Sequence, residues 1–250
     1  MKVIVNGACG RMGRQIVSLI QSSDEITMTA AVDKFIPADI NYECVNSIEA
    51  VNEKADAIID FSNHTGVINL CKYAVSNKTP LMVATTGFSD DELAAIHAAA
   101  EEIPVFLCAN TSVGIALLAS LARQAAAVME GADIEIIEHH HNTKLDSPSG
   151  TALMLANEIC EELDGEQSYV FGRHGHNKRD VNEIGIHSVR MGKVVGVHEI
   201  YITNGDETIT LRHEAHNRTL LAQGALTAAK YVAGKTANGL YGMKDMLAGK

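Results

Sequence analysis

Short apolar runs alternate with amphipathic stretches along the first 111 residues of the chain. The runs are bounded by glycine, proline or polar residues, which predicts five buried strands. These runs are KVIVNG, ITMTAAVD, ADAIIDFS, LMVATTG and VFLCAN. Apolar residues at helical spacing predict helices over residues 11–22, 64–77 and 89–102. Strands separated by helices are typical of βαβ units, so we expect a Rossmann-type, doubly wound parallel sheet.

The pattern changes after residue 111. A long helix is expected over residues 112–130, then a strand in ADIEIIEHH and a helix over 149–163. The segment from residue 182 to residue 215 reads as consecutive strands with turns at MGK and at NGD, and Asn-Gly is a strong hairpin signal. Strands without intervening helices indicate an antiparallel or mixed sheet.

The chain is therefore expected to form two domains. Residues 1–111 with 219–250 form a dinucleotide-binding domain, and residues 112–218 form an α+β domain with a mixed sheet. A last helix, from Asn217 to Ala233, has Asn217 as its expected N-cap and returns the chain to the first domain.

Glycines follow the first strand in VNGACGRMGRQI. Gly7, Gly10 and Gly13 stand at the turn into a helix, where backbone N–H groups and the helix dipole can bind a pyrophosphate. Asp33 ends the second strand, 20 residues after Gly13, and can accept hydrogen bonds from ribose hydroxyls, which favours NAD. Lys34 can pair with the 2′-phosphate of NADP, so both cofactors are expected.

Two further strand ends carry candidate cofactor contacts. Ligands of open α/β sheets bind outside the carboxyl ends of the strands. In ATTGFS and CANTSVG, we expect Thr85, Thr86, Ala109 and Asn110 to line the nicotinamide side. Ordinary strand-to-helix turns are the alternative interpretation.

Composition and charge narrow the function classes. The net charge of −11 argues against nucleic acid as a partner. No apolar run reaches the length of a membrane span, and MKVIVNGACG does not resemble a signal peptide, so we expect a cytoplasmic protein without a membrane partner. The five cysteines include no C-x-x-C pair, which indicates neither a zinc ribbon nor a disulfide framework.

Three adjacent histidines lie in EHHHNTKLDSPSGTA, residues 138–152. Side chains of a strand alternate between its faces, so Glu138 and His140 share one face and His139 and His141 the other. The three rings cannot easily converge on one ion, and no cysteine or second histidine pair stands nearby at ligand spacing. We therefore expect no metal site.

The same run contains a candidate anion pocket. Lys144 supplies a positive charge, and the helix that follows offers N–H and hydroxyl donors at Ser149, Gly150 and Thr151. These groups suit a substrate carboxylate, and a neighbouring histidine can give or take a proton near neutral pH. The residues alone leave open which histidine acts. A polar strand end with an ordinary capped helix is the alternative.

The helix itself is expected to begin within DSPSG. Ser147 is its expected N-cap, with Pro148 at the first helical position and Gly150 permitting close approach of a ligand. Its expected buried face consists of Leu153, Ala156, Ile159 and Leu163.

Over essentially its whole length, the chain resembles the bacterial dihydrodipicolinate reductases (4-hydroxy-tetrahydrodipicolinate reductases) of lysine and diaminopimelate biosynthesis. The resemblance rests on GACGRMG, ATTGFS, ANTSVG, EHHHNTKLDSPSGTA, IHSVRMGKVVGVHEI and HEAHNRTLLAQGALTAAKYV. The most specific of these contains the pattern HHxxxKxDxPSGTA. Asn142 and Thr143 depart from the family, because basic residues are common at these positions.

The resemblance implies roles for individual residues. It makes His140 the acid–base group, His141 a substrate contact, and Lys144 a proton donor or substrate-orienting group, while Gly150 and Thr151 hold a carboxylate. It also implies a cofactor site for NADH or NADPH formed by Gly7, Ala8, Cys9, Gly10, Arg11, Met12, Asp33, Lys34, Ala84, Thr85, Thr86, Cys108, Ala109, Asn110 and Thr111. The family is usually a homotetramer assembled through the sheet of the second domain.

We therefore expect an enzyme that transfers a hydride from NAD(P)H to a cyclic, unsaturated dicarboxylate. An aspartate or homoserine dehydrogenase-like enzyme would explain the first domain equally well, but not KLDSPSGTA. A nucleotide-sensing subunit without turnover and Schiff-base chemistry at Lys144 are further alternatives. The preferred nucleotide and the hydroxylated or dehydrated form of the substrate stay open. We also expect domain closure, because the anion pocket and the nicotinamide belong to different domains.

Overall fold

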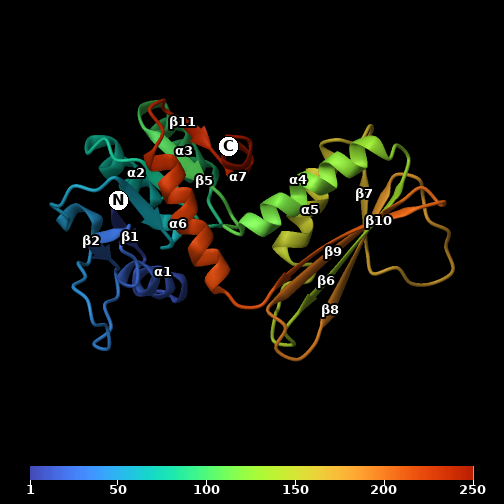
Figure 1. The fold of residues 1–250 in the computed structure, drawn as a ribbon, viewed down its shortest axis with the longest axis horizontal. Coiled ribbons are helices and arrows are strands. Elements are labelled where there is room, and N and C mark those ends of the chain that lie inside the picture. Colours follow the sequence, from blue (N-terminus) through green and yellow to red (C-terminus); the bar gives the residue numbers. More distant parts are fainter. Residues whose placement is uncertain (250) are drawn as a thin grey trace. The chain divides into compact units, whose positions relative to one another are not determined.

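The computed structural model describes residues 1–249 and divides the chain into two compact units. Unit 1 contains Met1–Ser112 and the chain from Thr219 onward, and unit 2 contains Val113–Arg218. Figure 1 shows that the chain enters unit 2 through helix α4 (Val113–Val128) and returns to unit 1 with helix α6 (Thr219–Ala233).

Unit 1 is built on a parallel sheet of six strands in the order β11-β5-β4-β3-β1-β2. Their bounds are β1 Lys2–Asn6, β2 Thr27–Val32, β3 Ala57–Asp60, β4 Leu81–Val83, β5 Pro104–Leu107 and β11 Gly239–Tyr241. Every pairing in this sheet is parallel, which confirms the Rossmann-type prediction. The strand order changes direction at β1 and β3, and in such sheets ligands bind at this switch point.

Helices pack on the sheet of unit 1 as the doubly wound pattern requires. Helices α2 and α3 pack against each other, and their apolar faces join Ile4, Ile58 and Val105 in one core cluster. Helices α1 and α6 contact each other as well as the sheet. The remaining bounds are α1 Arg11–Gln21, η1 Ile48–Ala50, η2 His64–Gly66, α2 Val67–Ser76, α3 Asp90–Glu102 and α7 Met243–Ala248.

Three details of unit 1 differ from expectation. The helix expected over residues 64–77 is a 3₁₀ turn followed by α2, and Asn63 accepts a hydrogen bond from the Thr65 N–H at its start. The last long helix begins at Thr219 and not at Asn217. Strand β11 and helix α7 were not predicted, because their segments are too short to carry a hydrophobic period.

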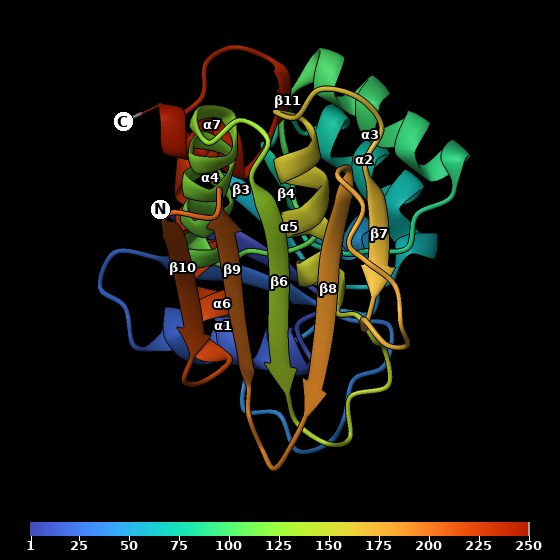
Figure 2. The ribbon, with the colours of Figure 1, turned by 90° about the vertical axis from the view of Figure 1, so that its right-hand side faces the viewer.

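Unit 2 contains a mixed sheet of five strands in the order β10-β9-β6-β8-β7, which Figure 2 shows face-on. Their bounds are β6 Asp133–His140, β7 Ser168–Phe171, β8 Glu183–Arg190, β9 Gly196–Thr203 and β10 Thr208–Ala215. Helices α4 and α5 (Gly150–Cys160) contact each other and lie on one face of this sheet (Figure 2). Their apolar residues share a core with Ile134, Ile136 and Ile200. None of the helices within residues 1–249 is long and apolar enough to cross a membrane.

The connection between β8 and β9 positions the histidine run. The MGK turn does not join neighbouring strands, because β6 lies between β8 and β9, parallel to the first and antiparallel to the second. The connection therefore crosses the carboxyl end of β6, where the Met191 N–H donates to the His140 carbonyl at 2.9 Å. The Asn204-Gly205 turn does join β9 to its neighbour β10, as predicted. Strand β7 was not predicted.

A close approach of two backbones in unit 1 gives a stability prediction. A Cβ atom at Gly224 of α6 would lie 1.7 Å from the carbonyl oxygen of Thr111. We predict that Gly224→Ala lowers the free energy of unfolding by about 1–3 kcal/mol, because the backbone must shift to relieve the clash. Gly66→Ala is the matched control, since its Cβ meets no atom within 4 Å. Equal denaturation midpoints for the two variants would contradict the prediction.

Candidate active site

The glycine loop after β1 fits a dinucleotide phosphate. Gly7 has φ +81°, and a Cβ atom there would lie 2.5 Å from the Phe61 carbonyl oxygen. A Cβ atom at Gly13 would lie 2.0 Å from the Gly7 carbonyl oxygen, so a larger residue would force the loop away from α1. Gly10 is the N-cap of α1 and offers no side-chain cap, and the first turn contains no acidic residue. The donors at this helix start are therefore suited to an anionic group.

Asp33 lies directly beside this loop. Its carboxylate accepts hydrogen bonds from the N–H groups of Cys9 at 2.9 Å and Phe35 at 3.1 Å. Lys34 is exposed at the same turn, and its ammonium lies 5.9 Å from the centre of the Phe35 ring. The structure thus brings the acidic and the basic candidate to one edge of the loop. Arg14, by contrast, forms two hydrogen bonds with Asp39 and is engaged within the fold.

Sequence reasoning missed a buried carboxylate at the switch point of the sheet. Asp60 ends β3 opposite Asn6 in register, and its side chain accepts hydrogen bonds from Asn6 Nδ2 at 2.7 Å, Ser62 Oγ at 2.6 Å and Thr85 Oγ1 at 2.7 Å. The pKa of Asp60 is raised, because the effect of burial outweighs the opposing effect of these hydrogen bonds. The signal in the sequence was an aspartate at the end of an otherwise apolar strand.

The other strand-end candidates divide into exposed and occupied groups. Thr86 and Ala109 are exposed at the carboxyl ends of β4 and β5. The Thr111 hydroxyl donates to the Leu221 carbonyl at 2.7 Å, and burial raises the pKa of the Cys108 thiol to about 12. Asn110 accepts a hydrogen bond from the Ser112 N–H at 2.8 Å. The backbones of Cys108, Asn110 and Thr111 lie at the end of β5. The Thr111 hydroxyl, however, is hydrogen-bonded within unit 1, and the Cys108 thiol is buried there.

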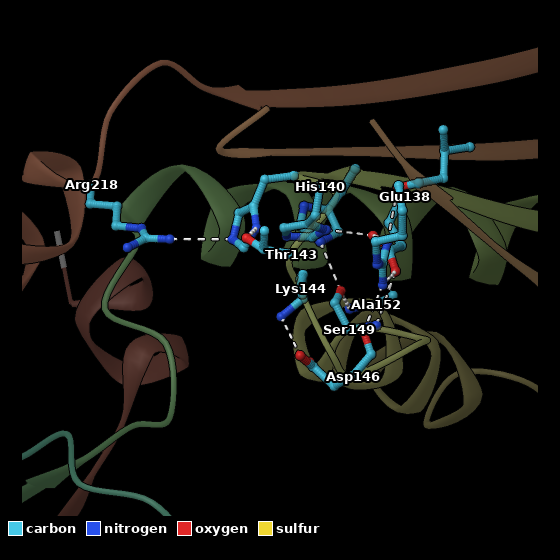
Figure 3. Close-up of polar contacts among 12 residues, drawn as sticks. Glu138, His140, Thr143, Lys144, Asp146, Ser149, Ala152 and Arg218 are labelled. Atoms are coloured by element: carbon cyan, nitrogen blue, oxygen red, sulfur yellow. Dashed lines mark hydrogen bonds and ion pairs between the residues drawn. The ribbon is translucent and has the colours of Figure 1, made fainter. Parts of the chain in front are cut away.

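Strand β6 alternates between its faces as predicted. Glu138 is fully buried and His140 is 9% exposed, whereas His139 between them is half-buried on the other face. The His140 ring contacts Glu138 through Nδ1, which lies 2.5 Å from Oε2 (Figure 3). Arg190 at the end of β8 donates to both carboxylate oxygens of Glu138, at 2.8 and 2.7 Å.

The state of Glu138 follows from these contacts. Burial alone would raise the pKa of its carboxyl, but hydrogen bonds from His140, Arg190 and Ser188 hold that pKa well below its usual range. Glu138 is therefore an ionised group in the interior of unit 2. Neither Glu138 nor Arg190 was a predicted site residue. Both stand in motifs that carry the family resemblance, which was the available signal.

The helix that follows the histidine run begins later than expected. Its N-cap is Ser149 and not Ser147, since Ser149 Oγ accepts the Ala152 N–H at 3.2 Å and Gly150 is the first helical residue. Pro148 therefore precedes the helix. The Ser149 N–H donates to Glu138 Oε1 at 3.1 Å, which ties this helix start to β6. The buried face of α5 consists of Ala152, Leu155, Ala156 and Ile159, with Leu153 and Leu163 only partly buried.

Lys144 lies on the loop between β6 and α5, where its ammonium is 2.8 Å from Asp146 Oδ1 (Figure 3). The pKa of Asp146 is lowered by the hydrogen bond from Lys144 and, more weakly, by one from the Gly150 N–H. A carboxylate of the protein itself thus contacts two of the donors predicted for a substrate carboxylate. A Cβ atom at Gly150 would meet no atom within 4 Å, so there is free space beside this residue.

Two further basic side chains lie near the histidine run and were not predicted. His198 of β9 is 4% exposed, its Nε2 lies 3.3 Å from Ser149 Oγ, and its ring centre is 5.3 Å from that of His140. Arg218 extends toward His141, with Nη2 at 3.4 Å from Nε2 (Figure 3). His141 also contacts the Thr143 hydroxyl through Nδ1 at 2.8 Å.

The buried state of His198 gives a pH-dependent stability. Burial, followed by the nearby charge of His140, lowers the pKa of His198 from 6.5 to about 3. Below pH 6.5 the unfolded chain binds a proton at His198 that the folded protein does not bind, so stability falls as the pH falls from 6.5 toward 3. We predict that His198 makes the free energy of unfolding fall by up to about 1.4 kcal/mol for each unit of decrease in pH within this range. His198→Gln should remove this dependence.

The measurement is the free energy of unfolding in denaturant at several pH values within this range. His97→Gln, at an exposed histidine of α3, controls for the loss of one imidazole. An unchanged pH slope in His198→Gln would contradict the prediction, whatever the stability of that variant at neutral pH.

Comparisons with known proteins cover both units. The family model described as dihydrodipicolinate reductase, N-terminus, matches residues 1–111, and the model described as dihydrodipicolinate reductase, C-terminus, matches residues 114–247. The 4-hydroxy-tetrahydrodipicolinate reductase of Caldanaerobacter subterraneus subsp. tengcongensis is 43% identical over 249 residues, covering 99% of this chain and 98% of the relative. The enzyme of the same name from Brachyspira hyodysenteriae is 40% identical, covering 99% of this chain and 100% of its own length.

Solved structures agree with these relatives. The dipicolinate-bound dihydrodipicolinate reductase from Paenisporosarcina sp. TG-14 has a TM-score of 0.83 at 26% identity and covers 98% of both chains. The aspartate dehydrogenase from Thermotoga maritima has a TM-score of 0.54 at 12% identity, with 96% of this chain and 99% of that chain covered, which shows a shared fold only. Since family models match nearly the whole chain and the relatives match over their full length, the chain belongs to the dihydrodipicolinate reductase family.

Proposed function

We propose that this chain reduces 4-hydroxy-tetrahydrodipicolinate, with loss of its hydroxyl group as water, or the already dehydrated dihydrodipicolinate, to tetrahydrodipicolinate with NAD(P)H, a step of lysine and diaminopimelate biosynthesis. The observation that carries the proposal is the cluster of Glu138, His140 and the start of α5, which combines a proton-exchanging ring with anion donors. The names of the full-length relatives support the same reaction.

A nicotinamide dinucleotide is the cofactor, and when bound it supplies the hydride. In our proposal, the residues from Gly7 to Met12 hold the pyrophosphate, and Asp33 holds the ribose hydroxyls. Lys34 lies at the same turn and provides the charge that a 2′-phosphate needs, so both nucleotides are accepted. Ala84, Thr85, Thr86 and the backbone from Cys108 to Thr111 line the nicotinamide side. The constrained backbone at Gly7 and Gly13 supports this assignment, because side chains at both positions would clash.

His140 handles the proton that accompanies the hydride. Its Nδ1 is engaged by Glu138, so Nε2 is the ring nitrogen that exchanges a proton with the substrate. Gly196 of β9 lies beside the His140 ring, and a Cβ atom there would be 3.1 Å from Nε2. The absence of a side chain at Gly196 therefore avoids a close contact with this nitrogen. Schiff-base chemistry at Lys144 receives no support, because a lysine paired with Asp146 is a poor nucleophile.

In our proposal Lys144, Gly150 and Thr151 hold a substrate carboxylate. Ser149 was predicted to join them, but its N–H donates to Glu138 and its Oγ caps α5, so it fixes the helix start instead. The first two helical residues of α5 direct their N–H groups toward its start, and Lys144 adds a positive charge. The substrate carboxylate replaces Asp146 at Lys144. His141 is a second substrate contact, and Arg218 beside it supplies positive charge where Asn142 and Thr143 are neutral.

The homotetramer implied by the family resemblance and the cytoplasmic location predicted from the sequence stay predictions. Sedimentation of the purified protein and fractionation of its source cells would measure them.

A steady-state assay tests the function. We predict that the purified protein oxidises both NADH and NADPH when enzymatically prepared 4-hydroxy-tetrahydrodipicolinate is supplied, because Asp33 and Lys34 favour different nucleotides. Nucleotide absorbance measures the turnover, and L-aspartate and L-homoserine with the oxidised nucleotides serve as comparison substrates. Turnover of an amino acid alone would indicate the dehydrogenase alternative, and nucleotide binding without any turnover would indicate a sensing subunit.

Substitutions in the histidine run identify the acid–base group. We predict that His140→Gln lowers kcat by about 10²–10⁴-fold with a much smaller change in KM, because general acid–base action is lost while binding is retained. His139→Gln is the matched control, since its side chain lies on the opposite face of β6. A normal kcat in His140→Gln would transfer the role to another histidine of the run.

A further inference from the structure

Glu138 accepts hydrogen bonds from several donors, and the proposed function so far includes only the one from His140. Its Oε2 accepts from His140 Nδ1 and Arg190 Nη1, and its Oε1 accepts from the Ser149 N–H and Arg190 Nη2. The donors come from β6, from β8 and from the N-cap of α5, so one fully buried side chain connects three segments. A charged group in the interior is retained only where such donors compensate its lost hydration.

The partners of Glu138 are not equivalent. The Ser149 N–H and the Arg190 guanidinium can only donate, whereas the neutral imidazole of His140 can donate or accept at Nδ1. A carboxylate, which can only accept, therefore selects the tautomer with the proton on Nδ1. In that tautomer Nε2 carries the lone pair that takes up and releases a proton.

The same carboxylate also sets the position of the anion donors. Oε1 holds the N–H of Ser149, the residue before the first turn of α5. Arg190 donates from Nη2 to the Asp146 carbonyl at 2.7 Å, which fixes the loop that carries Lys144. The distance between Nε2 of His140 and the start of α5 is thus set through one side chain.

We propose that Glu138, held by Arg190, is a positioning residue that keeps His140 in the Nδ1-protonated tautomer and holds it in register with the anion-binding start of α5. Its effect on rate rests on the proposed function, while its effect on the tautomer does not. In this proposal, Oε2 of Glu138 orients the ring that transfers the proton, and Oε1 holds the helix start that binds the substrate.

Other ionisable groups also face this region. His198 from β9, Lys144 and Asp146 from the loop, and Arg190 from β8 surround His140 together with Glu138. Within residues 1–249, Glu138 is the one of these groups that forms a hydrogen bond with the His140 ring. A purely structural ion pair of Glu138 with Arg190 is the competing interpretation, and it predicts a loss of stability without a change of tautomer.

Glu138→Gln separates the two interpretations. An amide offers one accepting oxygen and one donating nitrogen. The Arg190 guanidinium and the Ser149 N–H can only donate, so the His140 ring and the Ser188 hydroxyl are the partners that can turn into acceptors. We therefore expect the amide nitrogen to face Nδ1, which moves the ring proton of the neutral imidazole to Nε2. Long-range nitrogen–proton NMR of histidine-labelled protein reads the tautomer directly, and the spectrum of His140→Gln assigns the signal.

Kinetics supply the second readout. We expect Glu138→Gln to lower kcat by about 10²–10⁴-fold with a smaller change in KM, because proton transfer from a wrongly protonated ring is lost. The limb of the pH profile of kcat that reports the proton donor should move to lower pH, since a neighbouring negative charge has been removed. Glu135→Gln is the matched control: this glutamate lies on the opposite face of β6 and also contacts a histidine, with His187 Nε2 at 2.7 Å.

The outcomes are distinguishable. A Glu138→Gln protein with the wild-type tautomer and wild-type kcat overturns the proposal, even if it is less stable. If Glu138→Gln does not fold, Arg190→Lys decides: a lowered kcat at an unchanged KM supports the proposal, and a wild-type kcat overturns it. If the wild-type protein does not turn over the substrate, the proposed function fails, while the tautomer measurement still tests the role of Glu138.

Discussion

An ionised carboxylate in an apolar interior requires donors on all sides, and this requirement organises unit 2. Glu138 meets it with a ring nitrogen from its own strand, a guanidinium from β8 and a backbone N–H from the start of α5. The guanidinium can reach Glu138 because β8 runs parallel to β6 and ends beside it. The helix start can reach it because the loop after His140 folds back over the same strand end. Removing the charge would leave several buried donors without partners, which is costly.

Unit 1 contains a comparable arrangement at the switch point of its sheet. Asp60 is buried at the end of β3 and receives donors from the ends of β1 and β4 and from the turn that follows it. The glycine loop starts at the next residue after Asn6, one of these donors. Each unit thus has a buried acidic side chain near a strand end that holds neighbouring segments together through hydrogen bonds.

Sequence patterns predicted the features that depend on residues close together in the chain, such as strand faces and the glycine loop. The period of β6 placed Glu138 and His140 on one face of the strand and His139 on the other, and the glycine spacing with Asp33 identified the loop beside β1. Both predictions depend on residues close in sequence. The roles of Arg190 and His198 were not predictable in this way, since they meet Glu138 and Ser149 across 52 and 49 residues of chain. The helix start was placed two residues early because Ser147 and Ser149 are equally good caps by residue type, and only the contact of Ser149 with Glu138 distinguishes them. The crossing of β6 by the β8–β9 connection depends on strand order, which the hydrophobic period does not encode.

The ion pair of Lys144 with Asp146 has a consequence for ligand selectivity. In the proposed binding mode, a substrate carboxylate replaces Asp146 at Lys144, so the contact with the lysine is not a net gain. A monocarboxylate therefore recovers little more than the protein already has, and a second anionic group on the ligand must provide the additional free energy. In this binding mode the protein's own aspartate favours a ligand with two carboxylates over a ligand with one.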